Sequence, residues 1–169
     1  MPLPVSRSSF APDFSLISFL IVDDQPFSRR LIHSMLLGFG SREVYESANG
    51  VEAYELARNA APNIIITDLV MPSFNGLGFI KMVKEPQSPC HQTPIIVLSG
   101  YLTKSAALTI KSSGADELLV KPVSPKSLYE HIVRIVLRSD AANRPLSFVQ
   151  NQKRRADQQR KKAGDVAYV

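Results

Sequence analysis

Three aspartates, a serine and a lysine have the chemistry of a site that could hold a cation and a phosphate. They stand directly after four apolar segments: Asp23 and Asp24 after residues 16–22, Asp68 after 63–67, Ser99 after 94–98, and Lys121 after 117–120. Three carboxylates that lie close together repel one another and take up protons unless a cation balances them. An all-oxygen set fits a hard cation such as Mg²⁺, and a lysine ammonium suits a phosphate. With a serine hydroxyl added, these groups predict transfer of a phosphoryl group onto an aspartate.

These residues can meet only if the segments before them are neighbouring strands. Near-continuous apolar runs such as 16–22 and 64–66 are typical of strands buried on both faces, and residues 43–47 alternate like a short edge strand. Segments with helical spacing lie between them, with Asn49 and Ser124 as predicted helix caps. Five strands that alternate with five helices predict an α/β fold with helices on both faces of a five-stranded parallel sheet. Open α/β folds place their ligand sites at the carboxyl edge of this sheet.

The composition is that of a globular chain from a reducing compartment. Of the 169 residues, 44% are hydrophobic and 21% are charged, close to globular averages. Cys90 is the single cysteine, which excludes an intramolecular disulfide and a cysteine-rich zinc module and favours the cytoplasm. No apolar run reaches the roughly 18 residues that span a bilayer, so we expect no contact with a membrane. Residues 14–22 lead straight into Asp23 without a cleavage site, which argues against secretion.

The net charge of +5 belongs to the end of the chain. Up to Leu137 there are 12 basic and 12 acidic residues, whereas from Arg138 onward there are 8 basic and 3 acidic residues. We therefore predict a flexible leader over residues 1–13, a folded domain over 14–138, and a basic, mobile tail over 139–169. A role of the tail in binding nucleic acid stays open, but about 31 residues leave no room for a helix-turn-helix DNA-binding domain.

Several short motifs resemble those of the receiver domain of bacterial two-component response regulators. The matching pieces are Ile21-Val22-Asp23-Asp24, Thr67-Asp68-Leu69-Val70-Met71-Pro72, Gly76, Val97-Leu98-Ser99-Gly100 and Val120-Lys121-Pro122. The resemblance covers residues from about 17 to 138. It implies a flavodoxin-like sheet with the strand order 2-1-3-4-5, and a chain of the stand-alone, single-domain type.

The resemblance also implies a role for each matching residue. Asp68 is the expected phosphoacceptor, and Ser99 and Lys121 are expected to contact the phosphoryl group. Asp23, Asp24, Asp68 and the backbone carbonyl of Val70 are the expected Mg²⁺ ligands. The phosphoryl donor is expected to be a histidine kinase or a histidine phosphotransferase. We expect no enzymatic activity beyond Mg²⁺-dependent self-phosphorylation and self-dephosphorylation, and signalling through protein–protein contacts.

Two surfaces are implied for protein partners. The first helix, with Phe27 and Leu31, and the loop after Lys121 are expected to dock the phosphodonor. Core packing is the alternative for these two apolar residues. The helix from Lys104, the last strand and the final helix are the expected output surface, and the downstream target stays unknown.

Two departures from the family pattern bear on signalling. Leu118 stands where the family usually has a tyrosine or phenylalanine switch, and Tyr101 is the nearest aromatic residue that could replace it. An alternative for Tyr101 is a half-exposed ring packed on the helix below. Val70 and Tyr101 also stand where relatives often have polar residues that orient a hydrolytic water. We therefore predict slow self-dephosphorylation.

The main alternative function is a degenerate receiver that acts as a phosphorylation-independent adaptor. A haloacid-dehalogenase phosphatase would need Asp-x-Asp after the first strand, and a nucleotide-binding fold would need a glycine-rich loop there. Neither is present. Cys90 and His91 are adjacent in a polar loop and make a poor metal site, and His33 and His131 are predicted to be surface or packing residues.

Overall fold

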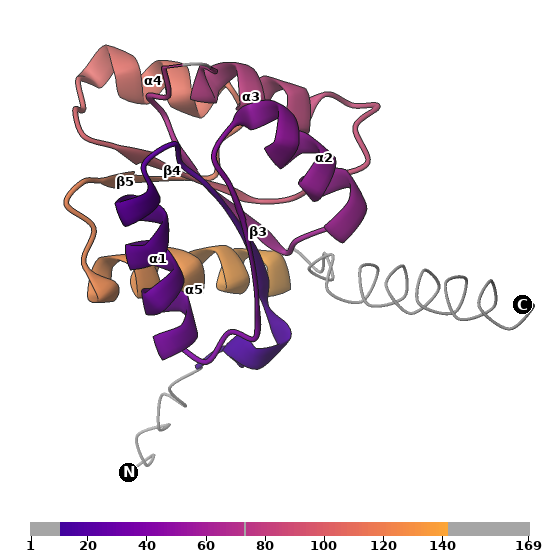
Figure 1. Ribbon diagram of the computed structural model, residues 1–169, viewed down its shortest axis with the longest axis vertical. Helices are drawn as coiled ribbons and strands as arrows, with labels where there is room; N and C mark the ends of the chain where they lie inside the picture. The colour runs from indigo at the N-terminus through magenta and orange to yellow at the C-terminus, as the bar shows by residue number, and fades with distance from the viewer. Residues whose placement is uncertain (1–10, 73, 142–169) are drawn as a thin grey trace, which may run out of the picture.

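The computed structural model describes residues 11–72 and 74–141, apart from the side chains of residues 140 and 141 (Figure 1). The strands are β1 (Ser18–Val22), β2 (Glu43–Ser47), β3 (Ile64–Asp68), β4 (Ile95–Ser99) and β5 (Glu117–Val120). The helices are the 3-10 turn η1 (Phe14–Leu16), α1 (Pro26–Gly38), α2 (Gly50–Ala60), α3 (Gly76–Lys84), α4 (Lys104–Ser112) and α5 (Pro125–Ala141). The predicted flexibility of the leader and the tail falls almost entirely outside the described residues. Within them, α5 continues past the predicted domain boundary at residue 138.

The five strands form one parallel sheet in the order β2-β1-β3-β4-β5. This confirms the predicted α/β fold and its strand order 2-1-3-4-5. The register pairs Val22 with Thr67 and Asp68 with Leu98. The carboxyl ends of β1, β3 and β4 therefore lie next to one another at one edge of the sheet.

Helices cover both faces of the sheet, as Figure 1 shows, with α1 and α5 on one side and α2, α3 and α4 on the other. Two buried clusters correspond to these two layers. One joins the sheet to Ile32 and Leu36 of α1 and to Leu128 of α5, and the other joins it to residues of α2, α3 and α4 such as Phe79. Every residue of β1, β3 and β4 is buried, whereas the edge strand β2 exposes Glu43. The apolar runs and the alternating strand thus occupy the places that their sequences predict.

Local sequence signals set several helix ends. The Asn49 side chain accepts a hydrogen bond of 2.8 Å from the Glu52 N–H at the start of α2, and Ser124 Oγ accepts one of 3.1 Å from the Ser127 N–H at the start of α5. Helix α2 ends at Ala60, and its C-cap Ala61 has a φ of +48°. Pro62 disfavours a helical conformation in the residue before it. None of the described helices combines the length and apolarity needed to cross a bilayer.

Candidate functional site

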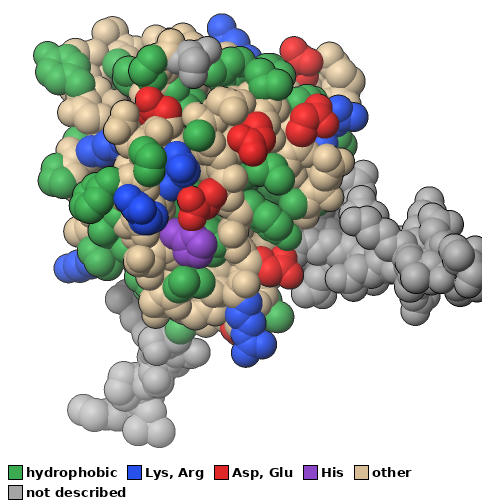
Figure 2. All heavy atoms as spheres, viewed as in Figure 1, with side chains coloured by type: hydrophobic (Ala, Val, Ile, Leu, Met, Phe, Trp, Pro, Cys, Tyr) green, Lys and Arg blue, Asp and Glu red, His purple; other side chains and the backbone are tan. Residues whose placement is uncertain are grey.

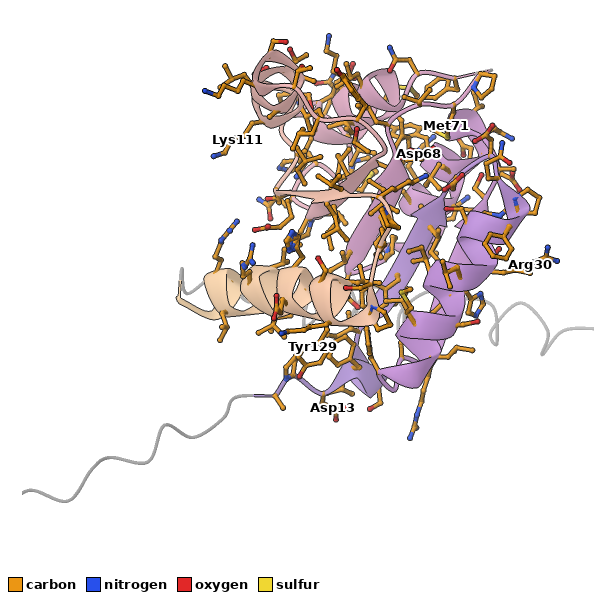
Figure 3. All side chains as sticks on the ribbon, turned by 90° about the vertical axis from the view of Figure 1, so that its left-hand side faces the viewer. Asp13, Arg30, Asp68, Met71, Lys111 and Tyr129 are labelled. Carbon is orange, nitrogen blue, oxygen red and sulfur yellow. The ribbon has the colours of Figure 1, made fainter. Side chains whose placement is uncertain are left out.

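Three aspartates meet at the carboxyl edge of the sheet. Asp23 and Asp24 follow β1, Asp68 is the last residue of β3, and one carboxylate oxygen from each lies within 4.8 Å of the others. Asp23 is 1% exposed and Asp68 is 6% exposed. Figure 3 shows Asp68 at the end of the molecule opposite to Asp13, which precedes the sheet. Among the described residues, this is the one group of three or more acidic, histidine or cysteine side chains close enough to share a metal ion.

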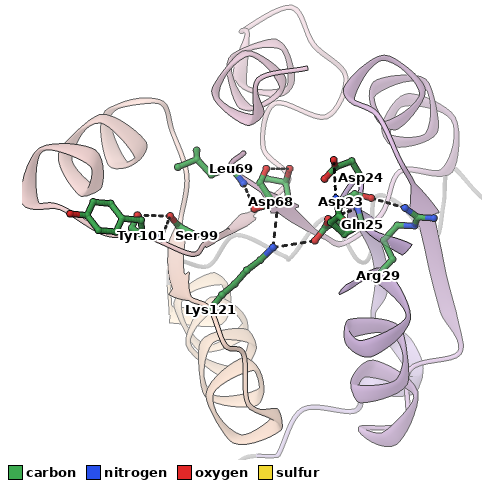
Figure 4. A network of polar contacts seen from close by, with 10 residues as sticks. Asp23, Asp24, Gln25, Arg29, Asp68, Leu69, Ser99, Tyr101 and Lys121 are labelled. Atoms are coloured by element: carbon green, nitrogen blue, oxygen red, sulfur yellow. Dashed lines mark hydrogen bonds and ion pairs between the residues drawn. The ribbon is translucent and has the colours of Figure 1, made fainter. Parts of the chain in front are cut away.

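Lys121 brings a positive charge into this cluster from the end of β5. Its Nζ lies 3.3 Å from Asp23 Oδ2 and 3.3 Å from Asp68 Oδ2, as drawn in Figure 4. The Lys121 side chain is 29% exposed, so part of it is in contact with solvent. Lys121 therefore links two of the carboxylates and leaves Asp24 without a lysine partner in the described contacts.

Asp68 is held so that its carboxylate faces Lys121. The Leu69 N–H donates a hydrogen bond of 2.8 Å to Asp68 Oδ1, and the Val70 N–H also donates to this carboxylate. Burial raises the pKa of Asp68 above its usual value, and the nearby charge of Asp23 raises it further, while Lys121 lowers it. Asp68 is thus a partly desolvated carboxylate beside a cation, which suits a nucleophile at neutral pH.

Asp23 is fixed through both its backbone and its side chain. The Asp23 N–H donates a hydrogen bond of 3.2 Å to the Ser47 carbonyl of β2. Its Oδ1 accepts a hydrogen bond of 2.8 Å from the Gln25 N–H, which leaves Oδ2 to face Lys121. The Arg29 side chain reaches the Asp23 carbonyl oxygen from α1. The buried aspartate therefore has a defined orientation.

A close backbone contact shapes the loop after β3. Gly76 begins α3, and its N–H donates a hydrogen bond of 3.1 Å to the Leu69 carbonyl. A Cβ atom at this position would lie 2.4 Å from the Asp68 carbonyl oxygen and 2.8 Å from that of Leu69. Only glycine lets α3 approach the end of β3 this closely, which gives a physical reason for the glycine in the motif.

Ser99 is not joined to the acidic cluster in this structure. Its hydroxyl donates a hydrogen bond of 2.7 Å to the Tyr101 carbonyl, and Figure 4 shows it turned toward Tyr101 and away from Asp68. Tyr101 is 79% exposed and Val70 is 72% exposed. The Tyr101 ring is therefore more exposed than the packed alternative predicts, and its proposed switch role stays a prediction.

The charges of the cluster fit a divalent cation. Lys121 provides one positive charge against three carboxylates, so two negative charges remain to be balanced. Carboxylate oxygens are hard ligands, and Mg²⁺ is held in proteins through one or two carboxylates, waters and phosphate oxygens. Asp24 is only half-buried, which leaves that side of the cluster accessible. The donor set thus suits Mg²⁺.

Other predicted or rejected sites lie apart from this cluster. Cys90 is buried, with its sulfur 3.2 Å from Ser88 Oγ, and His91 Nδ1 lies 2.8 Å from the Ser88 carbonyl. His131 packs against β5, with Nε2 3.2 Å from the Leu118 carbonyl. Arg29 was not among the predicted site residues, and its neighbour His33 was assigned to the surface or to packing. Arg29 reaches the Asp23 carbonyl directly from α1. His33 is joined to Arg29 through Glu46 of β2, and this tertiary link is one that local sequence patterns do not reveal.

Comparisons with known proteins agree with this geometry. Residues 19–133 match the family model described as the response regulator receiver domain. The chain is 34% identical over 125 residues to chemotaxis protein CheY1 of Helicobacter pylori, an alignment that covers 73% of this chain and 100% of CheY1. It is 35% identical over 122 residues to the transcriptional regulatory protein SrrA of Staphylococcus aureus, covering 72% of this chain and 48% of SrrA.

Solved structures give the same result. The chemotaxis response regulator CheY4 of Vibrio cholerae superimposes with a TM-score of 0.65 and is 34% identical, covering 70% of this chain and 98% of CheY4. The receiver domain protein from Methanospirillum hungatei, at 24% identity and a TM-score of 0.68, shows the same fold. With the fold, the strand-end residues and these relatives in agreement, the chain belongs to the family of response regulator receiver domains.

Proposed function

We propose that this chain is a phosphoacceptor in a two-component phosphorelay. It receives a phosphoryl group on Asp68, with Mg²⁺, from a histidine kinase or a histidine phosphotransferase, and signals through protein–protein contacts. The observation that supports this most is the pairing of the Asp68 carboxylate with Lys121 at 3.3 Å, beside two further carboxylates. This combination provides a nucleophile, a cation for the phosphoryl oxygens and ligands for a metal.

The transfer itself follows from these groups. An oxygen of the ionised Asp68 carboxylate attacks the phosphorus atom, the P–N bond of the phosphohistidine breaks, and its electron pair stays on the imidazole nitrogen. Lys121, already beside Asp68 Oδ2, donates hydrogen bonds to the phosphoryl oxygens. The Asp68 Oδ1 atom stays on the Leu69 N–H, which keeps the carboxylate oriented. The product is an acyl phosphate on Asp68.

Mg²⁺ would be held by Asp23, Asp24, Asp68 and the backbone carbonyl of Val70. When bound, it neutralises charge on the phosphoryl oxygens during transfer. Asp23 and Asp24 place two carboxylates close together, so the acidic pair itself favours binding of a divalent ion. We expect no turnover of a separate substrate, only Mg²⁺-dependent self-phosphorylation and self-dephosphorylation.

An apolar pocket beside Lys121 is the proposed docking place for the phosphodonor. It has a volume of about 350 Å³ and is lined by Gln25, Phe27, Ser28, Leu31, Ile32, Lys121, Pro122 and Val123. Phe27 is 74% exposed and Leu31 is 42% exposed, so neither is a core residue. Exposed apolar side chains on α1 suit the surface of a helical bundle that presents a phosphohistidine. Such donors act inside the cell, and we place the chain in the cytoplasm.

A second groove lies on the proposed output surface. It has a volume of about 440 Å³ and is formed by α4, β5 and α5, with Ile110 and Leu118 among its lining residues. Leu118 has neither an aromatic ring nor a hydroxyl, so the family's usual aromatic switch is absent at this position. Tyr101, with its ring exposed, is our hypothesis for the residue that replaces this switch, and Tyr101→Ala tests it. If binding to the target stays equally dependent on phosphorylation, the hypothesis is wrong.

The proposed function is tested by intact mass spectrometry. The chain is incubated with a small acyl-phosphate donor and Mg²⁺, or with the donor and EDTA. Wild type should gain one phosphoryl group with Mg²⁺ only, and Asp68→Asn should gain none. Asp13→Asn removes the same charge at the opposite end of the molecule and should behave as wild type. A wild-type chain that takes up no phosphoryl group would contradict the proposal and favour the phosphorylation-independent adaptor.

A further inference from the structure

The peptide between Asp23 and Asp24 determines where both metal-binding side chains point. The N-terminal side of this peptide is fixed by two hydrogen bonds. The Asp23 N–H donates to the Ser47 carbonyl of β2, and the Asp23 side chain accepts from the Gln25 N–H. The Asp23 carbonyl belongs to the peptide that leads into Asp24. A rotation of this peptide would move the half-buried Asp24 carboxylate relative to the buried Asp23 and Asp68.

Arg29 is the side chain that holds this carbonyl. It lies on the first turns of α1, and its Nη1 donates a hydrogen bond of 2.7 Å to the Asp23 oxygen, as Figure 4 shows. The Arg29 side chain is 17% exposed, so the contact is partly shielded from water. A charged donor at this distance makes a stronger hydrogen bond than a neutral one.

Two further residues hold Arg29 in this position. Its Nε lies 3.3 Å from Glu46 Oε2 of β2, and the other Glu46 oxygen contacts His33 Nδ1, one turn further along α1. The hydrogen bond from His33 is the main cause that lowers the pKa of Glu46, and Arg29 lowers it too. An ionised Glu46 therefore accepts from both side chains. Figure 2, viewed as in Figure 1, shows basic and acidic side chains close together on the face of the molecule where α1 lies.

We infer that Arg29 is a positioning residue for the metal site, held in place by Glu46 and His33. The guanidinium group has donors in a fixed fork, and here one arm takes the Glu46 carboxylate and the other takes the Asp23 carbonyl. The fork links the edge strand β2 and helix α1 to the acidic pair. This inference rests on the proposed function, because it concerns how that site binds Mg²⁺.

The direction in which Mg²⁺ affinity changes when Arg29 is removed distinguishes a positioning role from a simple effect of its charge. Arg29 is a cation near three carboxylates, so if only its charge mattered, its removal would strengthen the binding of another cation. If Arg29 served the fold alone, its removal would lower the unfolding midpoint and leave the Mg²⁺ affinity of the folded chain unchanged. Positioning predicts weaker binding of Mg²⁺ in a chain that is folded.

The test is a calorimetric titration of the unphosphorylated full-length chain with MgCl₂. The variants are Arg29→Ala and Glu46→Gln. Their matched controls are Arg30→Ala, an exposed arginine next to it on α1, and Glu43→Gln, an exposed glutamate on the same strand. Urea unfolding in EDTA, followed by circular dichroism, gives the folded fraction of each variant.

We expect Arg29→Ala to weaken Mg²⁺ binding about tenfold, which is the lower end of the loss in affinity when a hydrogen-bond partner of a metal ligand is removed. Glu46→Gln should also weaken Mg²⁺ binding. The controls should stay within about twofold of wild type, because exposed charges are screened. Unchanged or tighter binding by folded Arg29→Ala overturns the inference. If Arg29→Ala does not fold, the inference is overturned when Glu46→Gln and Glu43→Gln bind Mg²⁺ with equal affinity. A wild type that binds Mg²⁺ but accepts no phosphoryl group contradicts the proposed function and leaves this inference standing.

Discussion

At the scale of single residues, Asp68 meets two opposing requirements. It must be ionised to attack phosphorus, yet the fold buries it and sets the negative charge of Asp23 beside it. Lys121 and the Leu69 N–H offset this cost only in part, since the pKa of Asp68 stays above its usual value. Repulsion between the carboxylates therefore persists until a cation balances their charge.

The raised pKa of Asp68 predicts how stability depends on pH. The pKa of Asp68 is higher in the folded state than its usual value of 3.8, so its ionised form destabilises the folded state. This destabilisation is lost as the pH falls through the raised pKa toward 3.8, because Asp68 becomes protonated. In EDTA at neutral pH, Asp68→Asn should therefore be more stable than wild type, by about 1 kcal/mol. The difference should shrink as the pH falls through that window. Urea unfolding at several pH values measures it.

Asp13 provides a control of the opposite sign. Hydrogen bonds from Ser15 lower the pKa of Asp13, so its ionised form favours the folded state above the usual pKa, and this contribution is lost as the pH falls through the lowered value. Asp13→Asn should therefore not stabilise the chain at neutral pH. An Asp68→Asn variant that is less stable than wild type in EDTA would contradict the electrostatic account of the site.

A second residue-scale prediction concerns the lifetime of the acyl phosphate. Val70 and Tyr101 are both exposed near the site and have no side-chain carboxylate or amide to orient a water. Wild type should therefore lose its phosphoryl group slowly, and Val70→Asn should shorten the lifetime by about tenfold or more. Mass spectrometry after removal of the donor measures this decay. Val51→Asn changes an exposed valine on α2 and should have no effect; a wild-type lifetime of seconds would count against the prediction.

At the scale of elements, the close approach of α3 to the end of β3 positions the acceptor. A Cβ at Gly76 would overlap the backbone of Asp68 and Leu69, so Gly76→Ala should destabilise the chain by about 2 kcal/mol and slow phosphoryl uptake. Gly78 lies on the same helix, and a Cβ there would meet its nearest atom at 4.0 Å. Gly78→Ala should be neutral or stabilising, because alanine favours helix. Equal unfolding midpoints for the two variants would rule out this role of Gly76.

The order of elements was predictable from sequence, but some of their ends were not. Residues 16–22 were expected to form one strand, whereas η1 takes up residues 14–16 and β1 begins at Ser18. Phe14 is buried and its ring lies 5.3 Å from that of Phe39 and 5.4 Å from that of Tyr129. This aromatic cluster fixes the turn, and it depends on residues that are distant in sequence. Strands β3 and β4 each begin and end one residue later than expected, because ladder pairing continues through Asp68 and Ser99.

The positions of the main site residues were predictable from sequence, but the directions of some side chains were not. Because parallel strands end at one edge, their sequence positions indicated that Asp23, Asp24, Asp68 and Lys121 would lie together, and the structure places them together. The direction of the Ser99 hydroxyl depends on a side-chain rotamer and a local backbone partner, which spacing does not determine. The Arg29–Glu46 contact depends on where α1 crosses β2, which is a tertiary feature.

At the scale of the whole molecule, metal binding should be linked to folding. The adjacent Asp23 and Asp24 meet Asp68, which is distant in sequence, only in the folded state. Mg²⁺ should therefore stabilise the folded state by about 2.7 kcal/mol at a concentration a hundredfold above its Kd. Urea unfolding with MgCl₂, against NaCl of equal ionic strength, measures this gain. Asp24→Asn should reduce the gain strongly. An equal gain in both salts would mean that Mg²⁺ acts only by screening.

Locating the modified residue shows whether Asp68 accepts the phosphoryl group. The chain is phosphorylated with a small acyl-phosphate donor and Mg²⁺, treated with borohydride, digested and mapped by mass spectrometry. Borohydride reduces an aspartyl phosphate to homoserine, so we expect homoserine at position 68 and unmodified aspartate at positions 23 and 24. Homoserine at another position, or at none in a chain that has gained a phosphoryl group, would mean that Asp68 is not the phosphoacceptor.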